Sequence, residues 1–273
     1  MIDISSLNLA ADGVFIKPNF LSSSLLEELN LELDTFFSQS ATSGQFGVSQ
    51  LDFSLKRIIS PTRVSTINIL ELALDVFFMV IPKNKQKDYL ICDIQINSER
   101  KNPYKLKFHT DNCKGEIRAQ IYLRGGKKNS GGFLYMRQTH LVDLDVEHFI
   151  DSSIEERFEN KTVECFGLPG DLIAFDASGF HGKDSCISER RTIMFTFYPR
   201  VSGYKETIDI NSSQISRSVR DNLQFFVPDL DAKAKPEWPD NFKNQPSTIS
   251  RSIKYRVKVA LWACFASFKA RLS

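Results

Sequence analysis

The chain has 273 residues, of which 42% are hydrophobic and 25% are charged, and its formal net charge is +2. This composition is typical of a globular protein, and a charge so near zero does not favour nucleic acid as a partner. Five cysteines without a Cys-x-x-Cys pair argue against a zinc site and a disulfide framework, so we expect a reducing, cytoplasmic location. The sequence shows no signal-peptide pattern and no run of about 18 apolar residues of the kind that spans a membrane.

Residues 1–88 are predicted to form a helical support region that packs on the rest of the domain. Residues 20–40 carry leucine and phenylalanine at helical spacing, with Ser24 as the expected cap. A second helix is expected to begin at Ser60 and to stop at Pro82.

From Tyr89 the apolar pattern changes to a period of two, which indicates strands. The predicted strands are short, rich in β-branched and aromatic residues, and separated by Gly, Pro, Asn or Asp. They cover residues 89–97, 104–111, 116–125, 131–139, 162–168, 171–177 and 190–200. This number of strands suits a jelly roll of the cupin type, which can hold a metal in its mouth. We therefore predict an α+β protein with a mainly β core, a double-stranded β-helix over residues 89–200.

An acidic segment lies between the predicted strands, at residues 139–161, and is expected to form a short helix or a lid. Its two histidines, His140 and His148, are interpreted as loop or surface residues rather than ligands.

Beyond residue 200 the strand pattern ends, and residues 201–248 are expected to form an irregular extension. Residues 249–273 predict a basic amphipathic helix, apolar along one side and rich in lysine and arginine along the other. Such a helix can lie on an anionic membrane, with Trp262 and Phe265 as anchors, or it can dock on its own domain. Both interpretations stay open at this point.

A candidate metal site begins with His109 and Asp111, two residues apart in a predicted strand. Side chains at i and i+2 leave the same face of a strand, so the imidazole and the carboxylate can converge on one point. A second histidine, His181, follows a later predicted strand and a short loop. Two imidazoles and one carboxylate form a facial iron site that leaves three positions open, enough for a bidentate 2-oxo acid and dioxygen. The alternative is a surface His-x-Asp pair that arose by chance.

Two arginines, Arg190 and Arg191, follow His181 by nine and ten positions. The distal carboxylate of a 2-oxo acid is best bound by a planar guanidinium, which offers two parallel donors. Arg191 is preferred because its neighbours on the same strand face are apolar, whereas those of Arg190 are more polar. The choice between the two arginines stays open.

Six short elements follow one another in the predicted core: "HTDN" at 109–112, "IYLRG" at 121–125, "GGFLYM" at 131–136, "GDLIAF" at 170–175, "FHG" at 180–182 and "ERRTIMFTFY" at 189–198. In this order they resemble the Fe(II)- and 2-oxoglutarate-dependent dioxygenases. The prolyl-hydroxylase-like branch is nearest, and the phytanoyl-hydroxylase-like branch is the runner-up. The resemblance covers roughly residues 89–200.

The resemblance implies an oxygenase that uses Fe(II), 2-oxoglutarate and O2, with His109, Asp111 and His181 as the iron ligands. It also implies that the Tyr122 hydroxyl contacts the co-substrate, although Tyr122 can equally be a core tyrosine. Because the carboxylate ligand is present, hydroxylation of an unactivated C–H bond, with release of succinate and CO2, is favoured over halogenation. Arg190 or Arg191 would anchor 2-oxoglutarate.

Two other functions stay in view. One is a cupin-type metal enzyme that does not use 2-oxoglutarate, and the other is a jelly-roll binding module without catalysis. The substrate is left open between a small molecule, a glycan or lipid, and a peptide. Peripheral membrane contact through residues 249–273 would favour the lipid class.

Overall fold

The computed structural model describes residues 6–39, 48–52, 69–99, 105–111, 115–142, 150, 152–200 and 216–226. Residues 1–200 and 204–234 belong to one compact unit. Residues 201–203 and 235–273 are assigned to a second unit and lie outside the described part, so the predicted basic helix at 249–273 stays a prediction. Within the described part, no helix is long and apolar enough to cross a membrane.

The core of the unit consists of two antiparallel sheets, which confirms the predicted α+β jelly-roll class. A six-stranded sheet has the order β1-β8-β5-β10-β3-β2, and a four-stranded sheet has the order β4-β9-β6-β7. The large sheet contains β1 (Val14–Lys17), β2 (Val48–Asp52), β3 (Tyr89–Glu99), β5 (Ile117–Arg124), β8 (Leu172–Asp176) and β10 (Arg190–Pro199). The small sheet contains β4 (Leu106–His109), β6 (Phe133–Met136), β7 (Thr162–Cys165) and β9 (His181–Lys183).

The described α-helices are α1 (Leu9–Asp12), α2 (Ser23–Gln39), α3 (Ile69–Val80), α4 (Ser152–Phe158) and α5 (Arg217–Asp221). Short 3-10 turns are η4 (Gln86–Asp88), η5 (Thr139–Leu141), η6 (Glu159–Lys161) and η7 (Leu223–Phe225). The expected short helix in the acidic segment is therefore present as α4.

The two predicted N-terminal helices correspond to α2 and α3, with differences at their starts. Ser22 rather than Ser24 receives the backbone N–H of Leu25 on its hydroxyl, at 3.3 Å. The other helix ends before Pro82 as predicted, and its expected start at Ser60 lies outside the described residues.

Three strands are not among those that the sequence pattern predicted. β1 pairs with β8 and β2 pairs with β3, so segments from before Tyr89 extend both edges of the large sheet. β9 has only three residues, too few for any period to be visible.

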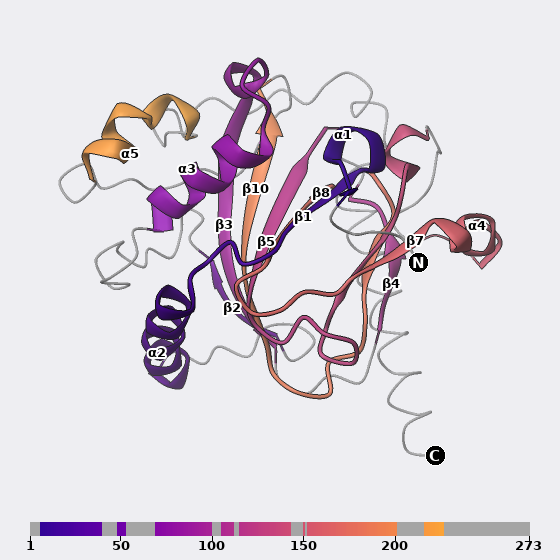
Figure 1. Cartoon of the computed structure of the whole chain (residues 1–273), viewed down its shortest axis with the longest axis horizontal. Helices are drawn as coiled ribbons and strands as arrows, with labels where there is room; N and C mark the ends of the chain where they lie inside the picture. The colour runs from indigo at the N-terminus through magenta and orange to yellow at the C-terminus, as the bar shows by residue number, and fades with distance from the viewer. Residues whose placement is uncertain are drawn as a thin grey trace, which may run out of the picture. The chain divides into compact units, whose positions relative to one another are not determined.

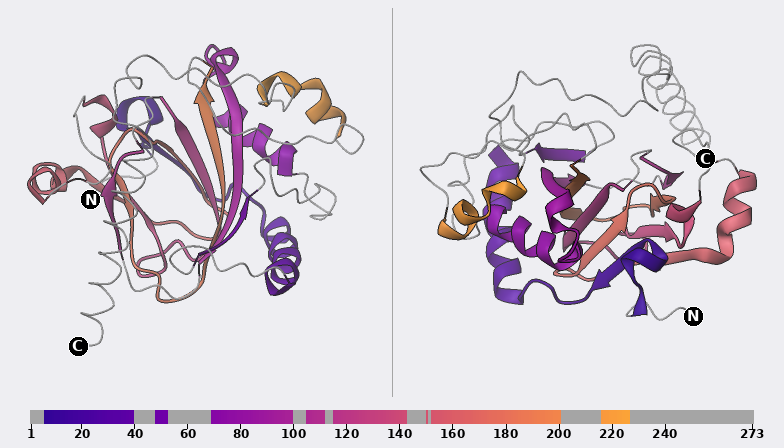
Figure 2. Two further views of the ribbon diagram at one scale, coloured as in Figure 1. Left: turned by 180° about the vertical axis from the view of Figure 1, so that it is seen from behind. Right: turned by 90° about the horizontal axis from the view of Figure 1, so that it is seen from above.

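The large sheet separates two interiors. On one side, α2, α3 and α5 lie along the sheet (Figures 1 and 2). Apolar residues of these helices and of β3, β5 and β10 form one cluster there, which includes Phe77, Ile193, Phe195 and Phe197. On the other side the sheet faces the four-stranded sheet, and a second cluster that includes Tyr122 fills part of the space. The two faces of β5 and β10 therefore meet different environments.

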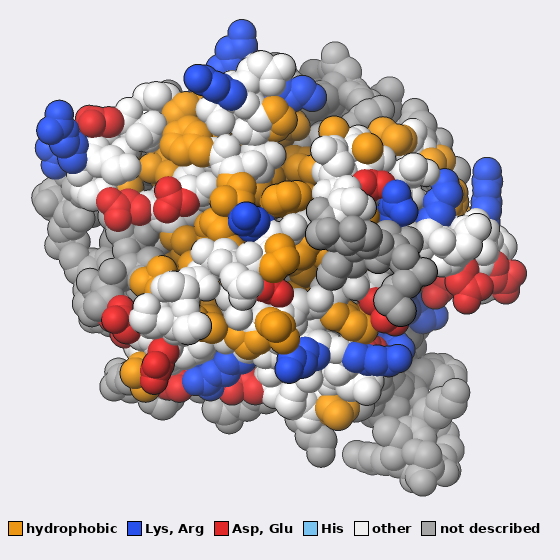
Figure 3. Space-filling model, in the orientation of Figure 1, with side chains coloured by type: hydrophobic (Ala, Val, Ile, Leu, Met, Phe, Trp, Pro, Cys, Tyr) orange, Lys and Arg blue, Asp and Glu red, His pale blue; other side chains and the backbone are white. Residues whose placement is uncertain are grey.

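The surface in the view of Figure 3 carries lysine, arginine, aspartate and glutamate interspersed with apolar side chains. Neither sign of charge dominates the described residues on this face, in keeping with the small net charge.

The helical layer offers a matched test of packing in Phe77 and Phe78. The Phe77 side chain is fully buried and lies edge-on to Phe197 at 5.5 Å between ring centroids, whereas Phe78 is 39% exposed. We expect Phe77→Ala to lower the free energy of unfolding by about 3–5 kcal/mol and Phe78→Ala by about 1 kcal/mol. Urea titration of both variants measures the difference, and equal losses would contradict the described packing.

Candidate metal centre

The pairing of β4 with β9 places the two histidines opposite each other. His109 ends β4, His181 begins β9, and the two are register partners in this antiparallel pair. Their ring centroids lie 4.4 Å apart. Residues 72 positions apart in the sequence thus present two imidazoles at one place, because cross-strand partners are nearest neighbours in a sheet.

Asp111 joins the two histidines from the segment that follows β4. Its backbone N–H donates to the carbonyl of Ala177 at 3.0 Å, which ties this segment to the loop before β9. The carboxylate lies 3.3 Å from His181 Nε2 and 4.0 Å from His109 Nε2. The predicted triad is therefore brought together, with one ligand atom from each residue and all within 4.8 Å of one another.

Backbone carbonyls hold both imidazoles in the orientation that a metal requires. Nδ1 of His109 lies 3.0 Å from the carbonyl of Lys107, and Nδ1 of His181 lies 2.9 Å from the carbonyl of Gly179. A carbonyl can only accept, so each Nδ1 carries the proton and each Nε2 keeps its lone pair for a ligand. Such outer contacts are what orient metal-binding histidines in proteins.

An arginine that the sequence analysis did not single out fixes the charge of the site. Arg118, on β5, lies 3.0 Å from Asp111 and also contacts the buried Glu116. Burial raises the pKa of Asp111, but the opposing effects, of which the positive charge of Arg118 is the largest, more than offset this and hold the pKa below its usual value. Burial, with a smaller contribution from His181, lowers the pKa of His109 to about 4. At neutral pH the carboxylate is therefore ionised and His109 is neutral, which are the forms that bind a metal.

The three residues fit a divalent metal. Ligand atoms about 2.1 Å from a metal, at right angles to one another, lie roughly 3 Å apart. In the structure, Asp111 Oδ2 lies 3.3 Å from His181 Nε2 and Asp111 Oδ1 lies 4.0 Å from His109 Nε2, and one ligand atom from each of the three residues lies within 4.8 Å of the other two. Side-chain movements of about 1 Å would therefore bring the three ligand atoms to a metal. Two nitrogens and one oxygen suit Fe(II), and they leave the remaining positions to other ligands.

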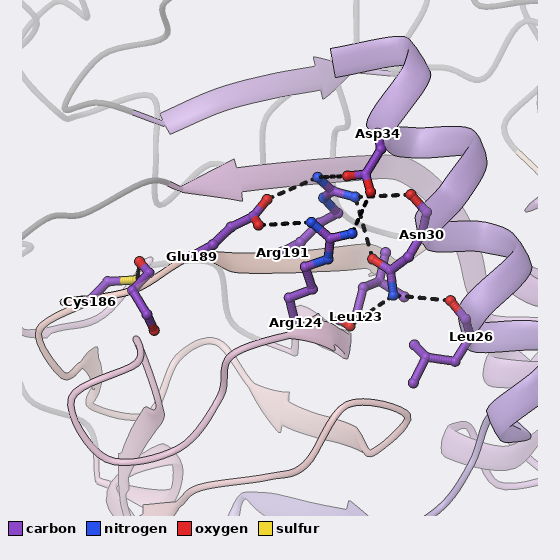
Figure 4. Close-up of polar contacts among 9 residues, drawn as sticks. Leu26, Asn30, Asp34, Leu123, Arg124, Cys186, Glu189 and Arg191 are labelled. Carbon is purple, nitrogen blue, oxygen red and sulfur yellow. Dashed lines mark hydrogen bonds and ion pairs between the residues drawn. The ribbon is translucent and has the colours of Figure 1, made fainter. Parts of the chain in front are cut away.

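The two candidate arginines lie on opposite faces of β10. Arg191 is 2% exposed and faces α2, where its guanidinium contacts Asp34 at 2.9 Å, Glu189 at 2.9 Å and Asn30 at 3.4 Å (Figure 4). Arg124 contacts the same two carboxylates, at 2.5 and 2.8 Å. These contacts hold α2 against the end of the large sheet, on the face away from the three ligands.

Arg190 faces the other way, toward the four-stranded sheet. Its Nη2 donates to Gln120 at 3.0 Å, and its guanidinium lies over the Tyr122 ring at 5.8 Å. Arg118, which contacts Asp111, is followed in β5 by Gln120 and Tyr122 at intervals of two residues. Side chains two residues apart point to the same side of a strand, so all three lie on one face. Within the described residues, the buried Nε of Arg190 has no hydrogen-bond partner.

These positions correct the physical argument that preferred Arg191. That preference required the apolar face of the last strand to border the site. In the structure that face, with Ile193, Phe195 and Phe197, packs in the core with α2 and α3. The more polar face, which carries Arg190, borders the space that contains the metal ligands.

Tyr122 is completely buried between the sheets. Its hydroxyl accepts the backbone N–H of Phe133 at 2.9 Å, and burial raises the pKa of Tyr122 to about 12. A Cβ on Gly126, where φ is +88°, would lie 2.7 Å from its ring. The described contacts are those of a core tyrosine that supports Arg190, and a contact with a co-substrate stays a prediction.

Of the two remaining histidines, only His140 belongs to the described residues, and it does not join the triad. His140 bonds to the carbonyl of Ala10 at 3.2 Å, and His148 lies outside the described residues. Like Arg118, Glu99 and Lys183 were not predicted from the sequence as site residues, and the structure places them near Arg190. The available signal was the alternation of polar side chains along otherwise apolar strands.

A scan against protein-family models finds no match, and a search of curated proteins finds none either. Among solved structures, HygX from Streptomyces hygroscopicus, with nickel and 2-oxoglutarate bound, is 15% identical and has a TM-score of 0.52, over 71% of this chain and 85% of HygX. The epimerase SnoN, in complex with Fe3+, alpha ketoglutarate and nogalamycin RO, is 11% identical with a TM-score of 0.54, over 76% of this chain and 89% of SnoN. EctD from S. alaskensis, with 2-oxoglutarate and 5-hydroxyectoine, is 12% identical with a TM-score of 0.55, over 72% of this chain and 76% of EctD.

The chain shares their fold. The matches cover 71–76% of this chain, which is more than residues 89–200 alone. With identities of 11–15%, the likeness concerns the fold, and the chemistry must be argued from the residues of this chain.

Removal of any one ligand tests the metal centre. We expect His109→Ala, Asp111→Asn and His181→Ala each to weaken binding of Fe(II) or Ni(II) by more than about 100-fold, because each leaves two ligands for the metal. Anaerobic calorimetric titration measures the affinity, and His140→Ala serves as the control that should bind like the parent. Retention of parental affinity in two of the three ligand variants would exclude this site.

The depressed pKa of His109 predicts a pH dependence of stability for the metal-free protein. The pKa rises from about 4 in the folded chain to 6.5 in the unfolded chain, so between these values the unfolded state binds more protons. The stabilising effect of the neutral form is complete above pH 6.5, and lowering the pH from 7.5 to 5 should cost about 2 kcal/mol. Urea unfolding in the presence of a chelator should show a correspondingly smaller loss in His109→Gln, and equal losses would contradict the shift.

Proposed function

We propose that the protein is an Fe(II)- and 2-oxoglutarate-dependent oxygenase. The observation that carries the proposal is the placement of three metal-ligating side chains and an incompletely bonded arginine in the space between the two sheets. His109, Asp111 and His181 supply the ligand set, and Arg190 supplies a guanidinium further along the same interior. The ligands described for HygX and SnoN, a metal ion together with 2-oxoglutarate, support this assignment.

The spacing of the cations suits a dicarboxylate that bridges the metal and Arg190. Arg118 and Gln120 are two residues apart in β5, a distance of roughly 7 Å along the strand. Arg118 lies beside the ligand Asp111, and Gln120 holds Arg190. A five-carbon diacid can therefore place its 2-oxo acid end at the metal and its distal carboxylate at Arg190, where a charge-assisted pair of hydrogen bonds can form.

The bound iron would supply dioxygen activation, coupled to conversion of 2-oxoglutarate into succinate and CO2. In a hydroxylation, one oxygen atom of O2 would enter succinate and the other would convert the substrate C–H group into C–OH. The protein contributes two imidazoles fixed by backbone carbonyls, a carboxylate kept ionised by Arg118, and the anchor that orients the co-substrate. Orientation matters because one C–H bond must lie near the metal while others are kept away.

Hydroxylation is the proposed outcome, and a small molecule is the proposed substrate. Epimerisation and carbocyclisation are the alternative outcomes, since SnoN is described as an epimerase and SnoK as a carbocyclase. The small-molecule class is favoured by the compounds bound in related folds, which include hygromycin B and 5-hydroxyectoine. The prolyl-hydroxylase-like branch, the cytoplasmic location and membrane contact through residues 249–273 stay predictions.

Anaerobic addition of 2-oxoglutarate to the Fe(II)-loaded protein tests the function directly. The expected result is a weak visible charge-transfer band that is absent without Fe(II) or in His109→Ala, followed by succinate formation when O2 is admitted. Iron binding without the band would favour the cupin-type enzyme, and absence of iron binding would favour the binding module.

A matched pair of variants tests which arginine anchors the co-substrate. We expect Arg190→Met to raise the Kd for 2-oxoglutarate by about 100-fold, since a pair of charge-assisted hydrogen bonds is lost. Arg191→Met should leave this Kd within about threefold of the parent but lower the free energy of unfolding by about 2 kcal/mol, because Asp34 and Glu189 lose a partner. Titration of the Ni(II)-loaded protein and urea unfolding measure the two quantities. The reverse ranking of the two Kd values would return the anchor to Arg191.

A further inference from the structure

A buried carboxylate lies between two cations at the place proposed for the distal end of the co-substrate. Glu99, the last residue of β3, is 1% exposed. One carboxylate oxygen contacts Lys183 Nζ, and the other lies 3.7 Å from Arg190 Nη1. The Lys183 and Arg190 side chains are themselves only 13% and 12% exposed.

The register of the strands fixes this arrangement. Glu99 and Arg190 are partners in the antiparallel pairing of β3 with β10, so their side chains are nearest neighbours on one face of the large sheet. Lys183 comes from β9 in the other sheet, two residues after His181, and therefore points into the same space as that ligand. The three charged groups thus share the interior with the metal centre.

Among the described residues, Glu99, Lys183 and Arg190 together carry one net positive charge, which is the charge that a single bound carboxylate would neutralise. Without Glu99, two buried cations would repel each other in the absence of a bound anion, and buried charge without compensation is costly. With Glu99 present, part of the attraction that Arg190 and Lys183 could give to an incoming carboxylate is already used. A carboxylate in this position therefore stabilises the co-substrate-free protein and weakens co-substrate binding.

Resting on the proposed function, we infer that Glu99 is an internal competitor of the distal carboxylate of the co-substrate. When the co-substrate binds, its distal carboxylate replaces Glu99 as the ion-pair partner of Arg190, and Glu99 keeps its contact with Lys183. Glu99 thereby sets the affinity for 2-oxoglutarate at a weaker value than the two cations alone would give. This effect of Glu99 on the affinity for 2-oxoglutarate does not depend on which substrate is oxidised.

The first test replaces the acid by its neutral isostere. Glu99→Gln should bind 2-oxoglutarate about tenfold more tightly than the parent, because both cations become available to the distal carboxylate. In the Ni(II)-loaded protein the same variant should have a lower Tm without 2-oxoglutarate and a larger increase in Tm on its addition. A merely structural role for Glu99 predicts a lower Tm together with unchanged or weaker binding, and that outcome would overturn the inference.

A second substitution closes a thermodynamic cycle. Lys183→Met removes the alternative partner of Glu99, which then pairs with Arg190 more fully, so the Kd for 2-oxoglutarate should rise about tenfold. The double variant Glu99→Gln with Lys183→Met has neither the competitor nor the second cation, and its Kd should return to within about threefold of the parent. A double variant that binds as weakly as Lys183→Met alone would contradict competition by Glu99.

Calorimetric titration of the redox-inert Ni(II) protein with 2-oxoglutarate separates this inference from the proposed function. If the parent protein binds 2-oxoglutarate and Glu99→Gln does not bind it more tightly, only the inference fails. If neither protein binds 2-oxoglutarate while Ni(II) is bound, the proposed function and the inference both fail. Succinate titrated as a shorter diacid provides the control, since it should bind more weakly than 2-oxoglutarate to both proteins.

Discussion

The antiparallel pairing of β4 with β9 is the constraint on which the site depends. These two short strands make His109 and His181 register partners, and the same sheet edge receives Asp111 through its backbone bond to Ala177. Because both imidazoles are held by backbone carbonyls, their orientation follows from the strand geometry itself and needs no further side chain. A shift of one residue in this pairing would turn one histidine away from the other.

The large sheet supplies the second element of the site by having two chemically different faces. Its outer face is apolar and packs against the helices, and its inner face carries Arg118, Gln120 and Arg190 toward the other sheet. Buried polar groups at this density are costly unless they bond to one another or to a ligand. They meet that requirement through ion pairs and hydrogen bonds, and among the described residues the buried Nε of Arg190 has no hydrogen-bond partner. This is the property expected of a position reserved for an anion.

The two arginines that are adjacent in the sequence have different roles because they lie on opposite faces of the large sheet. Arg191 belongs to the outer face and holds α2 through Asp34, together with Arg124 and Glu189 (Figure 4). Arg190 belongs to the inner face and pairs across the strands with Glu99. The ion pairs of Arg191 keep the end of β10 in place. They thereby support the position of Arg190, although Arg191 itself does not face the space between the two sheets. Because successive side chains of a strand point to opposite faces, Arg191 has a structural role and Arg190 lies at the site.

The sequence by itself determined the jelly-roll class, most of the strands and the three candidate ligands, because these depend on local period and on residue types with few alternative uses. It could not decide between Arg190 and Arg191, since both faces of β10 are buried and only the tertiary structure shows which face borders the metal ligands. It also could not place β1, β2 and β9 in their sheets, or bring Glu99 and Lys183 to Arg190, because these contacts join segments far apart in the chain. The local sequence pattern shows which residues share a face of a strand. Which of the two faces borders the site depends on how the two sheets pack against each other.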